Sequence, residues 1–169
     1  DVVCCMVLWT WINKIRIYFG KRALQKEAAR LQRVKRAVNL SEAREIGILF
    51  NMVSEEEYER VGKFAKSLQE QGKKVHIIGL FHAKKLPPYY IPKLAYDIIT
   101  PVNLDLFYRP DTLFAKQFID HPFDILIDLS TISEFPLHYI AVLSKAGFKL
   151  GRMVEDKEIS WMPSYGPEM

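Results

Sequence analysis

The chain has 169 residues, of which 49% are hydrophobic, 12% aromatic and 26% charged, and its formal net charge at pH 7 is +4. This composition is typical of one folded globular domain and excludes wholesale disorder and collagen-like or repeat architectures. Two adjacent cysteines, Cys4 and Cys5, exclude a disulfide framework and a thiolate metal site, and they favour a reducing, cytoplasmic compartment.

The positive charge is concentrated in the first 36 residues. That segment carries nine bases against Asp1 and Glu27, a net charge of +7, whereas the remaining 133 residues carry 15 bases and 18 acids, a net charge of −3. A basic arm of this kind favours contact with a polyanion, either nucleic acid or an anionic membrane surface. Two alternatives stay open: the arm docks on the protein's own body or a partner, or its bases only keep it in solution.

The arm predicts one long basic amphipathic helix from Trp9 to about Val38, either straight or bent near Gly20, with a length of up to about 45 Å. Its downstream half places apolar residues opposite a row of bases. The apolar residues are Leu24, Ala28 and Leu31, and the bases are Arg22, Lys26, Arg30 and Arg33. An upstream apolar stripe with the same spacing consists of Leu8, Ile12, Ile15 and Phe19.

The arm supplies two sets of candidate contact residues. The candidates for binding a polyanion are Lys21, Arg22, Lys26, Arg30, Arg33, Lys35 and Arg36. The candidates for a membrane interface are Trp9, Trp11, Ile12, Ile15 and Phe19. The apolar run from Val2 to Ile12 is too short to cross a bilayer, and its charges follow it, which is the wrong order for a secretory signal. Asp1 is not an initiator residue, whereas Met6 is a plausible start of the protein. Residues 1–5 are therefore interpreted as upstream read-through or part of a cut fragment.

Strands and helices alternate after the arm. The predicted elements are a strand at 46–51, a helix from Ser54 to about Gln71 with a capping box at Glu57 and a stop at Gly72, a strand at 74–81, a short strand at 97–100, a helix at 112–119, a strand at 123–130, a helix at 136–146 closed by Gly147, and a strand at 148–153.

This order predicts an α/β protein, a three-layer Rossmann-like sandwich around a mostly parallel sheet. The predicted organisation is a helical arm at 1–40, the sandwich at 41–154, and an irregular or truncated tail at 155–169.

The loop after the first strand disfavours a phosphate ligand. It lacks glycine, and four acids crowd the start of the following helix, where they would repel an anion. These acids are Glu55, Glu56, Glu57 and Glu59. No dinucleotide is therefore expected, and no other cofactor is assigned.

The loop after the strand at 123–130 holds the candidate ligand residues, Asp128, Ser130, Thr131 and Ser133. A carboxylate followed by three hydroxyls suits a metal or a sugar hydroxyl. The favoured alternative is structural: Asp128 accepts loop amides and the hydroxyls cap the next helix. The four histidines, His76, His82, His121 and His138, show no metal-ligand spacing. No nucleophile elbow occurs, so no catalytic residue and no metal ligand is assigned.

Two stretches, 117–130 and 144–152, resemble an uncharacterised family of small Bacteroidetes-type bacterial proteins, a domain of unknown function. The residues that carry the resemblance are Gln117-Phe-Ile-Asp-His-Pro-Phe-Asp-Ile-Leu-Ile-Asp-Leu-Ser130 and Ser144-Lys-Ala-Gly-Phe-Lys-Leu-Gly-Arg152. The resemblance covers roughly residues 6–154 and implies no chemistry. A weaker similarity to the N-terminal half of heptosyltransferase-type glycosyltransferases implies a Rossmann-like topology.

Three functional hypotheses follow. The leading one is a non-catalytic cytoplasmic adaptor whose arm contacts RNA, such as a ribosome surface, or an anionic membrane, which would place it at the inner membrane face. The alternative is a sugar- or nucleotide-related enzyme or ligand-binding domain that uses the loop after Asp128. The third is a homodimer formed through the apolar stripe of the arm.

Overall fold

The sheet confirms the predicted α/β class and is parallel throughout. The computed structural model describes residues 2–32 and 34–151, and for residues 2–7 it describes the backbone only. Its five strands lie in the order β3-β2-β1-β4-β5, and every neighbouring pair is parallel. The predicted tail at 155–169 and the side chains of Cys4 and Cys5 lie outside the described residues.

The elements follow the chain in this order: α1 (Val2–Arg30), β1 (Glu45–Asn51), α2 (Glu55–Glu70), β2 (Lys74–Leu80), β3 (Tyr96–Ile99), the 3₁₀ helix η1 (Pro101–Asn103), α3 (Leu113–Asp120), β4 (Ile125–Asp128), α4 (Phe135–Leu143) and β5 (Phe148–Gly151).

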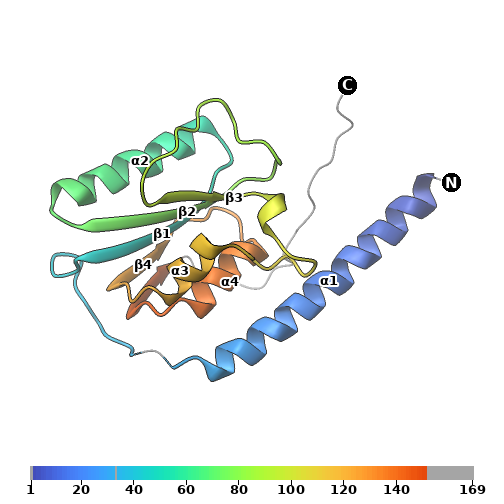
Figure 1. Cartoon of the computed structure of the whole chain (residues 1–169), viewed down its shortest axis with the longest axis horizontal. Coiled ribbons are helices and arrows are strands. Elements are labelled where there is room, and N and C mark those ends of the chain that lie inside the picture. The colour runs from blue at the N-terminus through green and yellow to red at the C-terminus, as the bar shows by residue number, and fades with distance from the viewer. Residues whose placement is uncertain (1, 33, 152–169) are drawn as a thin grey trace.

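The sheet lies between two helical layers (Figure 1), with α2 on one face and α3 and α4 on the other. Side chains of β1 alternate between the faces, as the period of a strand requires. Ile46, Ile48 and Phe50 pack in the cluster that contains α2, and Leu49 packs in the cluster that contains α3 and α4. All four are at most 1% exposed, and burial of each stabilises the fold by about 1.5–3 kcal/mol.

Local signals placed most of the predicted boundaries correctly. Ser54 caps α2 by accepting a hydrogen bond from the Glu57 backbone N–H, and Gly72 ends the turn after it with a φ of 80°. The helix predicted at 136–146 is shorter, because α4 ends at Leu143. Ser144 there turns extended, and the next N–H, of Lys145, donates to the Ile119 carbonyl. A tertiary hydrogen bond thus ends this helix before Gly147.

The helix predicted to reach Val38 ends at Arg30. The chain beyond it leaves the helical path and runs beside the start of β5, where the Arg36 N–H donates to the Gly147 carbonyl at 3.1 Å. This crossing is required because α1 lies outside α4, whereas β1 begins in the middle of the sheet. Of the predicted polyanion contacts, Lys21, Arg22, Lys26 and Arg30 lie on α1, Lys35 and Arg36 lie in this crossing segment, and Arg33 is outside the described residues.

The two apolar stripes of α1 lie on opposite faces of the helix. Leu24 is buried in a cluster with Phe135, Tyr139 and Leu143 of α4, and Ala28 packs against the same cluster. Ile15 lies nine residues before Leu24, which is about 180° around a helix, and it is 50% exposed. The helix runs through Gly20 without interruption, so the change of stripe is not a bend.

Polar contacts fix the docked face of α1 along much of its length. The Tyr108 hydroxyl donates to Asn13 Oδ1 at 2.7 Å, and the Arg16 guanidinium donates to the Leu106 carbonyl. Farther along, Glu27 accepts a hydrogen bond from the Tyr139 hydroxyl at 2.8 Å and pairs with Arg109 at 3.6 Å. The face of α1 that meets solvent is therefore set by the fold.

Gly20 is the point of closest approach between α1 and the body, and it provides a test of the docking. A Cβ there would lie 2.5 Å from the Phe107 carbonyl oxygen and 2.9 Å from the Phe135 ring. Gly20→Ala should lower the free energy of unfolding by about 1–3 kcal/mol through overpacking, although alanine favours a helix by roughly 1 kcal/mol. Urea unfolding followed by circular dichroism measures the change.

Gly62 in α2 is the matched control, because a Cβ there would meet no atom within 4 Å. Gly62→Ala should raise the free energy of unfolding by roughly 0.5–1 kcal/mol. Stabilisation by both substitutions would show that α1 does not pack on the body.

Candidate functional site

The carboxyl edge of the sheet holds a buried polar network built from three separate elements. Asn51 ends β1, His82 follows β2, and Glu134 is the N-cap residue of α4. Glu134 Oε1 accepts a hydrogen bond from Asn51 Nδ2 at 2.7 Å and lies 2.8 Å from His82 Nε2. Asn51 is 2% exposed and Glu134 is 3% exposed, so this carboxylate is almost removed from water.

Three oxygens of this region are buried without a hydrogen-bond partner: Asn51 Oδ1, Glu134 Oε2 and Ser130 Oγ. A buried polar group left unpaired costs about 1–3 kcal/mol, so natural proteins rarely retain one without a reason. Leu49 pairs with Asp128, and Asn51 and Ser130 each lie two residues beyond that pair. The three oxygens therefore belong to the segments at the ends of β1 and β4 and to the start of α4.

The ends of β1 and β4 flank the topological switch point of the sheet. β1 continues into α2 on one face, whereas β4 continues into α4 on the other, so the two loops diverge. Ligands of open α/β sheets bind in the crevice that such divergence leaves. Two of the unpaired oxygens can only accept hydrogen bonds, and Ser130 can accept or donate. The arrangement suits a ligand that presents hydroxyl or amine donors.

The structure agrees in part with the structural interpretation of the predicted ligand loop after Asp128. Asp128 Oδ1 accepts a hydrogen bond from the Ser130 N–H at 2.9 Å, which confirms that Asp128 binds a loop amide. The expectation that the hydroxyls cap the next helix is wrong, because Glu134 occupies the N-cap and makes no side-chain cap bond. Ser130 is buried, Ser133 is half-buried and Thr131 is exposed, so only Ser130 adds an oxygen to the buried network.

The outer face of α1 carries the predicted membrane-interface residues. Trp9, Trp11, Ile12, Ile15 and Phe19 are 41–65% exposed, and Leu8 and Tyr18 beside them are 62% and 57% exposed. At about 100° per residue, Ile12, Ile15 and Phe19 share one face with Arg22, Lys26 and Arg30. The single acid of the helix, Glu27, points to Tyr139 and Arg109 instead. The outer face thus passes from an apolar row to a purely basic row.

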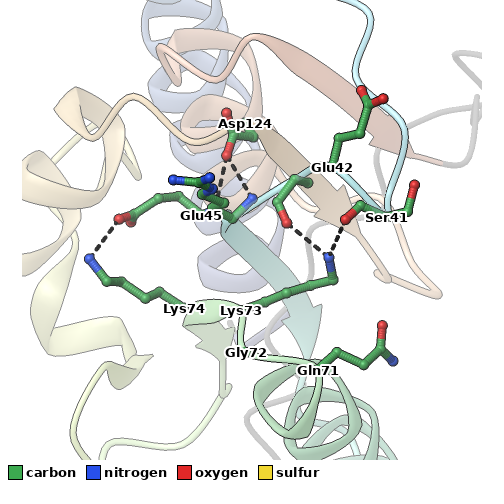
Figure 2. A pocket seen from close by; sticks show the side chains of 10 residues that line it. Ser41, Glu42, Glu45, Gln71, Gly72, Lys73, Lys74 and Asp124 are labelled. Carbon is green, nitrogen blue, oxygen red and sulfur yellow. Dashed lines mark hydrogen bonds and ion pairs between the residues drawn. The ribbon is translucent and has the colours of Figure 1, made fainter.

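The amino edge of the sheet holds a cavity of about 800 Å³, and Lys73, Lys74, Glu45 and Asp124 in its lining are engaged in hydrogen bonds and ion pairs (Figure 2). Lys73 is 7% exposed, and its ammonium donates to the carbonyls of Leu40 at 2.6 Å and Ala43 at 2.8 Å. Asp124 Oδ2 accepts from the N–H groups of Arg44 and Glu45, and these bonds lower the pKa of Asp124. The contacts tie the turn before β1 to β2 and β4, which is a structural role.

Glu45, at the rim of this cavity, also belongs to a cluster with two histidines. Glu45 Oε2 lies 2.8 Å from His121 Nε2, and the His121 ring stacks on the His76 ring with centroids 5.1 Å apart. One ligand atom from each of these three residues lies within 4.8 Å of the others. Sequence spacing gave no metal pattern for the histidines because the three residues come from β1, β2 and the end of α3.

Sequence reasoning also missed Asn51, His82 and Glu134. Two local signals existed: a polar Asn51 at the end of an otherwise apolar run, and an acid directly before the Phe-Pro start of α4. Neither signal indicates that the two side chains meet, because 83 residues separate them.

The chain was compared with protein families, curated proteins and solved structures. Residues 16–160 match the model of a family described as "Family of unknown function (DUF6913)". No curated protein and no solved structure matches the chain.

The His82–Glu134 pair predicts a pH dependence of stability. The hydrogen bond to Glu134 raises the pKa of His82 above 6.5, whereas burial lowers the pKa of His76. A group whose pKa is higher in the folded state stabilises the fold below its unfolded pKa and loses that contribution as the pH rises through its folded pKa. The contribution of His82 should therefore be present below pH 6.5 and disappear above it.

The first measurement is the free energy of unfolding of the wild type and of His82→Gln across this pH range. NMR titration of the imidazole signals then gives the order of the pKa values of His82 and His76. The wild type should lose more stability than the variant as the pH rises from 6 to 8. Equal pH profiles, or a His82 that titrates below His76, would contradict it.

Proposed function

The chain belongs to the family of unknown function DUF6913, and we propose that it attaches to an anionic membrane surface through the outer face of α1. One observation carries this proposal: exposed apolar and aromatic side chains form a row on this face, and three bases continue the row. Helices that lie in a membrane interface combine an apolar face with aromatic rings and bases.

The apolar part of the face supplies the attachment. Leu8, Ile12, Ile15 and Phe19 are each 41–62% exposed, and transfer of their exposed surface out of water would contribute about 1 kcal/mol per side chain. Packing against α4 and the 104–110 loop occupies the opposite face of α1, and of the four side chains only Phe19 has a ring contact with that loop, to Phe107 with centroids 6.3 Å apart. In Figure 1 the N-terminal part of α1, which bears this row, extends past the body.

The basic part of the face supplies the preference for anionic lipid. Arg22, Lys26 and Arg30 are exposed, and each base near an anionic surface contributes about 1 kcal/mol at physiological ionic strength. An RNA surface would use the bases and the aromatic rings, but it gives no role to the aliphatic Leu8, Ile12 and Ile15. The aliphatic residues therefore favour lipid over RNA.

Peripheral attachment fits the mixed apolar and basic composition of α1. No helix within the described residues combines the length and the hydropathy that crossing a bilayer requires. A helix that lies in the plane of the interface needs only one apolar face. The proposal places the body beside the membrane. An adaptor role, a Bacteroidetes-type source and a position at the inner membrane face remain predictions from the sequence.

Vesicle sedimentation tests the attachment. The protein should pellet with phosphatidylcholine vesicles that contain phosphatidylserine, and binding should fall about tenfold or more in Ile12→Ser/Ile15→Ser, which loses two half-exposed aliphatic side chains. Arg22→Gln/Lys26→Gln should weaken binding by a similar factor at low salt only.

Each variant has a matched control elsewhere on the surface. Ile91→Ser/Leu94→Ser removes two side chains that are 63% and 100% exposed, and Lys63→Gln/Lys66→Gln removes two exposed bases of α2; both should bind as the wild type does. Absence of vesicle binding together with salt-sensitive binding to a single-stranded RNA would overturn the membrane proposal in favour of the RNA alternative.

A second candidate function, recognition of a ligand with hydroxyl groups at the carboxyl edge, is supported by the three unpaired buried oxygens. They would accept hydrogen bonds from sugar hydroxyls, in keeping with the weaker similarity to heptosyltransferase-type proteins. The acids in the first turn of α2 oppose a phosphate there.

Saturation-transfer NMR with D-ribose and D-glucose tests this candidate. Signal transfer should be seen with the wild type and should fall at least about tenfold in Glu134→Gln, since an amide donor can replace the free acceptor oxygen. Glu59→Gln, an exposed acid of α2, is the control and should leave the transfer unchanged. Equal transfer with both variants would contradict a role for Glu134.

A further inference from the structure

Three side chains of metal-ligand type converge at the amino edge of the sheet, far along the chain from one another. They are Glu45, the first residue of β1, His76 in β2, and His121, the residue after α3. We propose that these two imidazoles and one carboxylate bind a divalent transition-metal ion, with zinc as the best fit. The proposal is independent of α1 and of the carboxyl edge.

The distances are close to those of a zinc site. Zinc binds imidazole nitrogen and carboxylate oxygen at about 2.0–2.2 Å, which places the donor atoms of a tetrahedral site roughly 3.3 Å apart. Glu45 Oε2 and His121 Nε2 are already 2.8 Å apart, and one atom from each of the three residues lies within 4.8 Å of the others. These separations must shorten by at most about 1.5 Å for the three atoms to bind one ion.

The backbone holds all three ligands in place. His76 lies opposite Gly47 in the register of β1 and β2, one pair beyond the pairing of Ile46 with Val75. The Glu45 N–H is bound by Asp124 Oδ2, and the His121 N–H donates to the Gln117 carbonyl at 3.0 Å. Ligands carried on regular elements lose little freedom on binding, which favours affinity.

The donor types suit a transition-metal cation. A metal ligand here is a carboxylate oxygen or the nitrogen of a neutral imidazole. Two nitrogen donors and one oxygen donor favour zinc over magnesium or calcium, which prefer oxygen ligands alone.

A three-residue site leaves a fourth coordination position for water or a ligand. His76 and His121 line a cavity of about 140 Å³, together with Asp97 and Gln117. Asp97 and Gln117 bring a carboxylate and an amide to the cavity, so they are positioned to bind a water or a small ligand on the metal. Three protein ligands with an open position are the arrangement of catalytic zinc sites rather than structural ones.

Lys74 opposes metal binding and therefore gives a sharp test. Its ammonium lies 3.1 Å from Glu45 Oε1, so it holds one carboxylate oxygen and adds a positive charge beside the site. Lys74→Gln should tighten zinc binding several-fold, since it frees that oxygen and removes the charge. If the cluster were only a hydrogen-bonded support, the same substitution would leave zinc affinity unchanged.

The experiment titrates zinc into the full chain after chelator treatment, in a Cys4→Ser/Cys5→Ser background that removes the thiols. Calorimetry should give one zinc per chain, and cobalt should give the intense visible absorption of a four-coordinate site. His121→Gln should weaken binding at least about 100-fold, the upper end of what loss of an outer-shell partner costs. His138→Gln, a histidine on the exposed surface of α4, is the matched control and should bind as the background does.

Circular dichroism confirms that each variant is folded. If His121→Gln does not fold, Glu45→Gln should show the loss of zinc affinity and Lys74→Gln the gain. Absence of a zinc-binding signal, equal affinities for the background and His121→Gln, or an unchanged affinity in Lys74→Gln would overturn the proposal.

Discussion

The close packing of α1 on α4 and the 104–110 loop determines which part of the arm meets solvent. Gly20 lets the helix approach until a Cβ would touch the Phe107 carbonyl and the Phe135 ring. Leu24 and Glu27 then bind the body on the same side. With that side fixed, the apolar row at Ile12 and Ile15 points outward by helical geometry alone. Which side chains of α1 face solvent therefore depends on the close contact at Gly20, which the absence of a side chain makes possible.

The buried polar groups at the two edges of the sheet differ in how fully they are hydrogen-bonded. At the amino edge, the Lys73 ammonium is satisfied by main-chain carbonyls, and Asp124 is satisfied by main-chain amides. At the carboxyl edge, Asn51 and Glu134 bind each other and still leave an oxygen each unpaired. Because such a group costs about 1–3 kcal/mol, a ligand that donates hydrogen bonds to these oxygens would offset that cost. The unpaired acceptors at the carboxyl edge are therefore the basis of the proposal that a ligand binds there.

Local chemistry made most of the fold predictable, and long-range contact limited the rest. The Ser54 cap, the stop at Gly72 and the apolar strand at 46–51 are encoded within a few residues, and all three are as predicted. The segment after α1 runs beside Gly147, and the segment after α4 bonds to Ile119, so the ends of both helices are followed by contacts with distant parts of the chain. The pairs Asn51–Glu134 and Glu45–His121 join residues 83 and 76 positions apart. No periodicity within one segment contains that information, so both sites emerged only from the topology.

The strand order also governs how the protein is completed during synthesis. β1 lies in the middle of the sheet, but its second neighbour, β4, is made about half a chain length later. The packing partners of α1 also lie far downstream of it, because the 104–110 loop follows β3 and α4 follows β4. Until the 104–110 loop and α4 are made, Leu24 lacks its packing partners, and both faces of the nascent helix display apolar side chains. A helix whose packing partners lie far downstream stays exposed to chaperones, to other chains and to membranes until those partners are made.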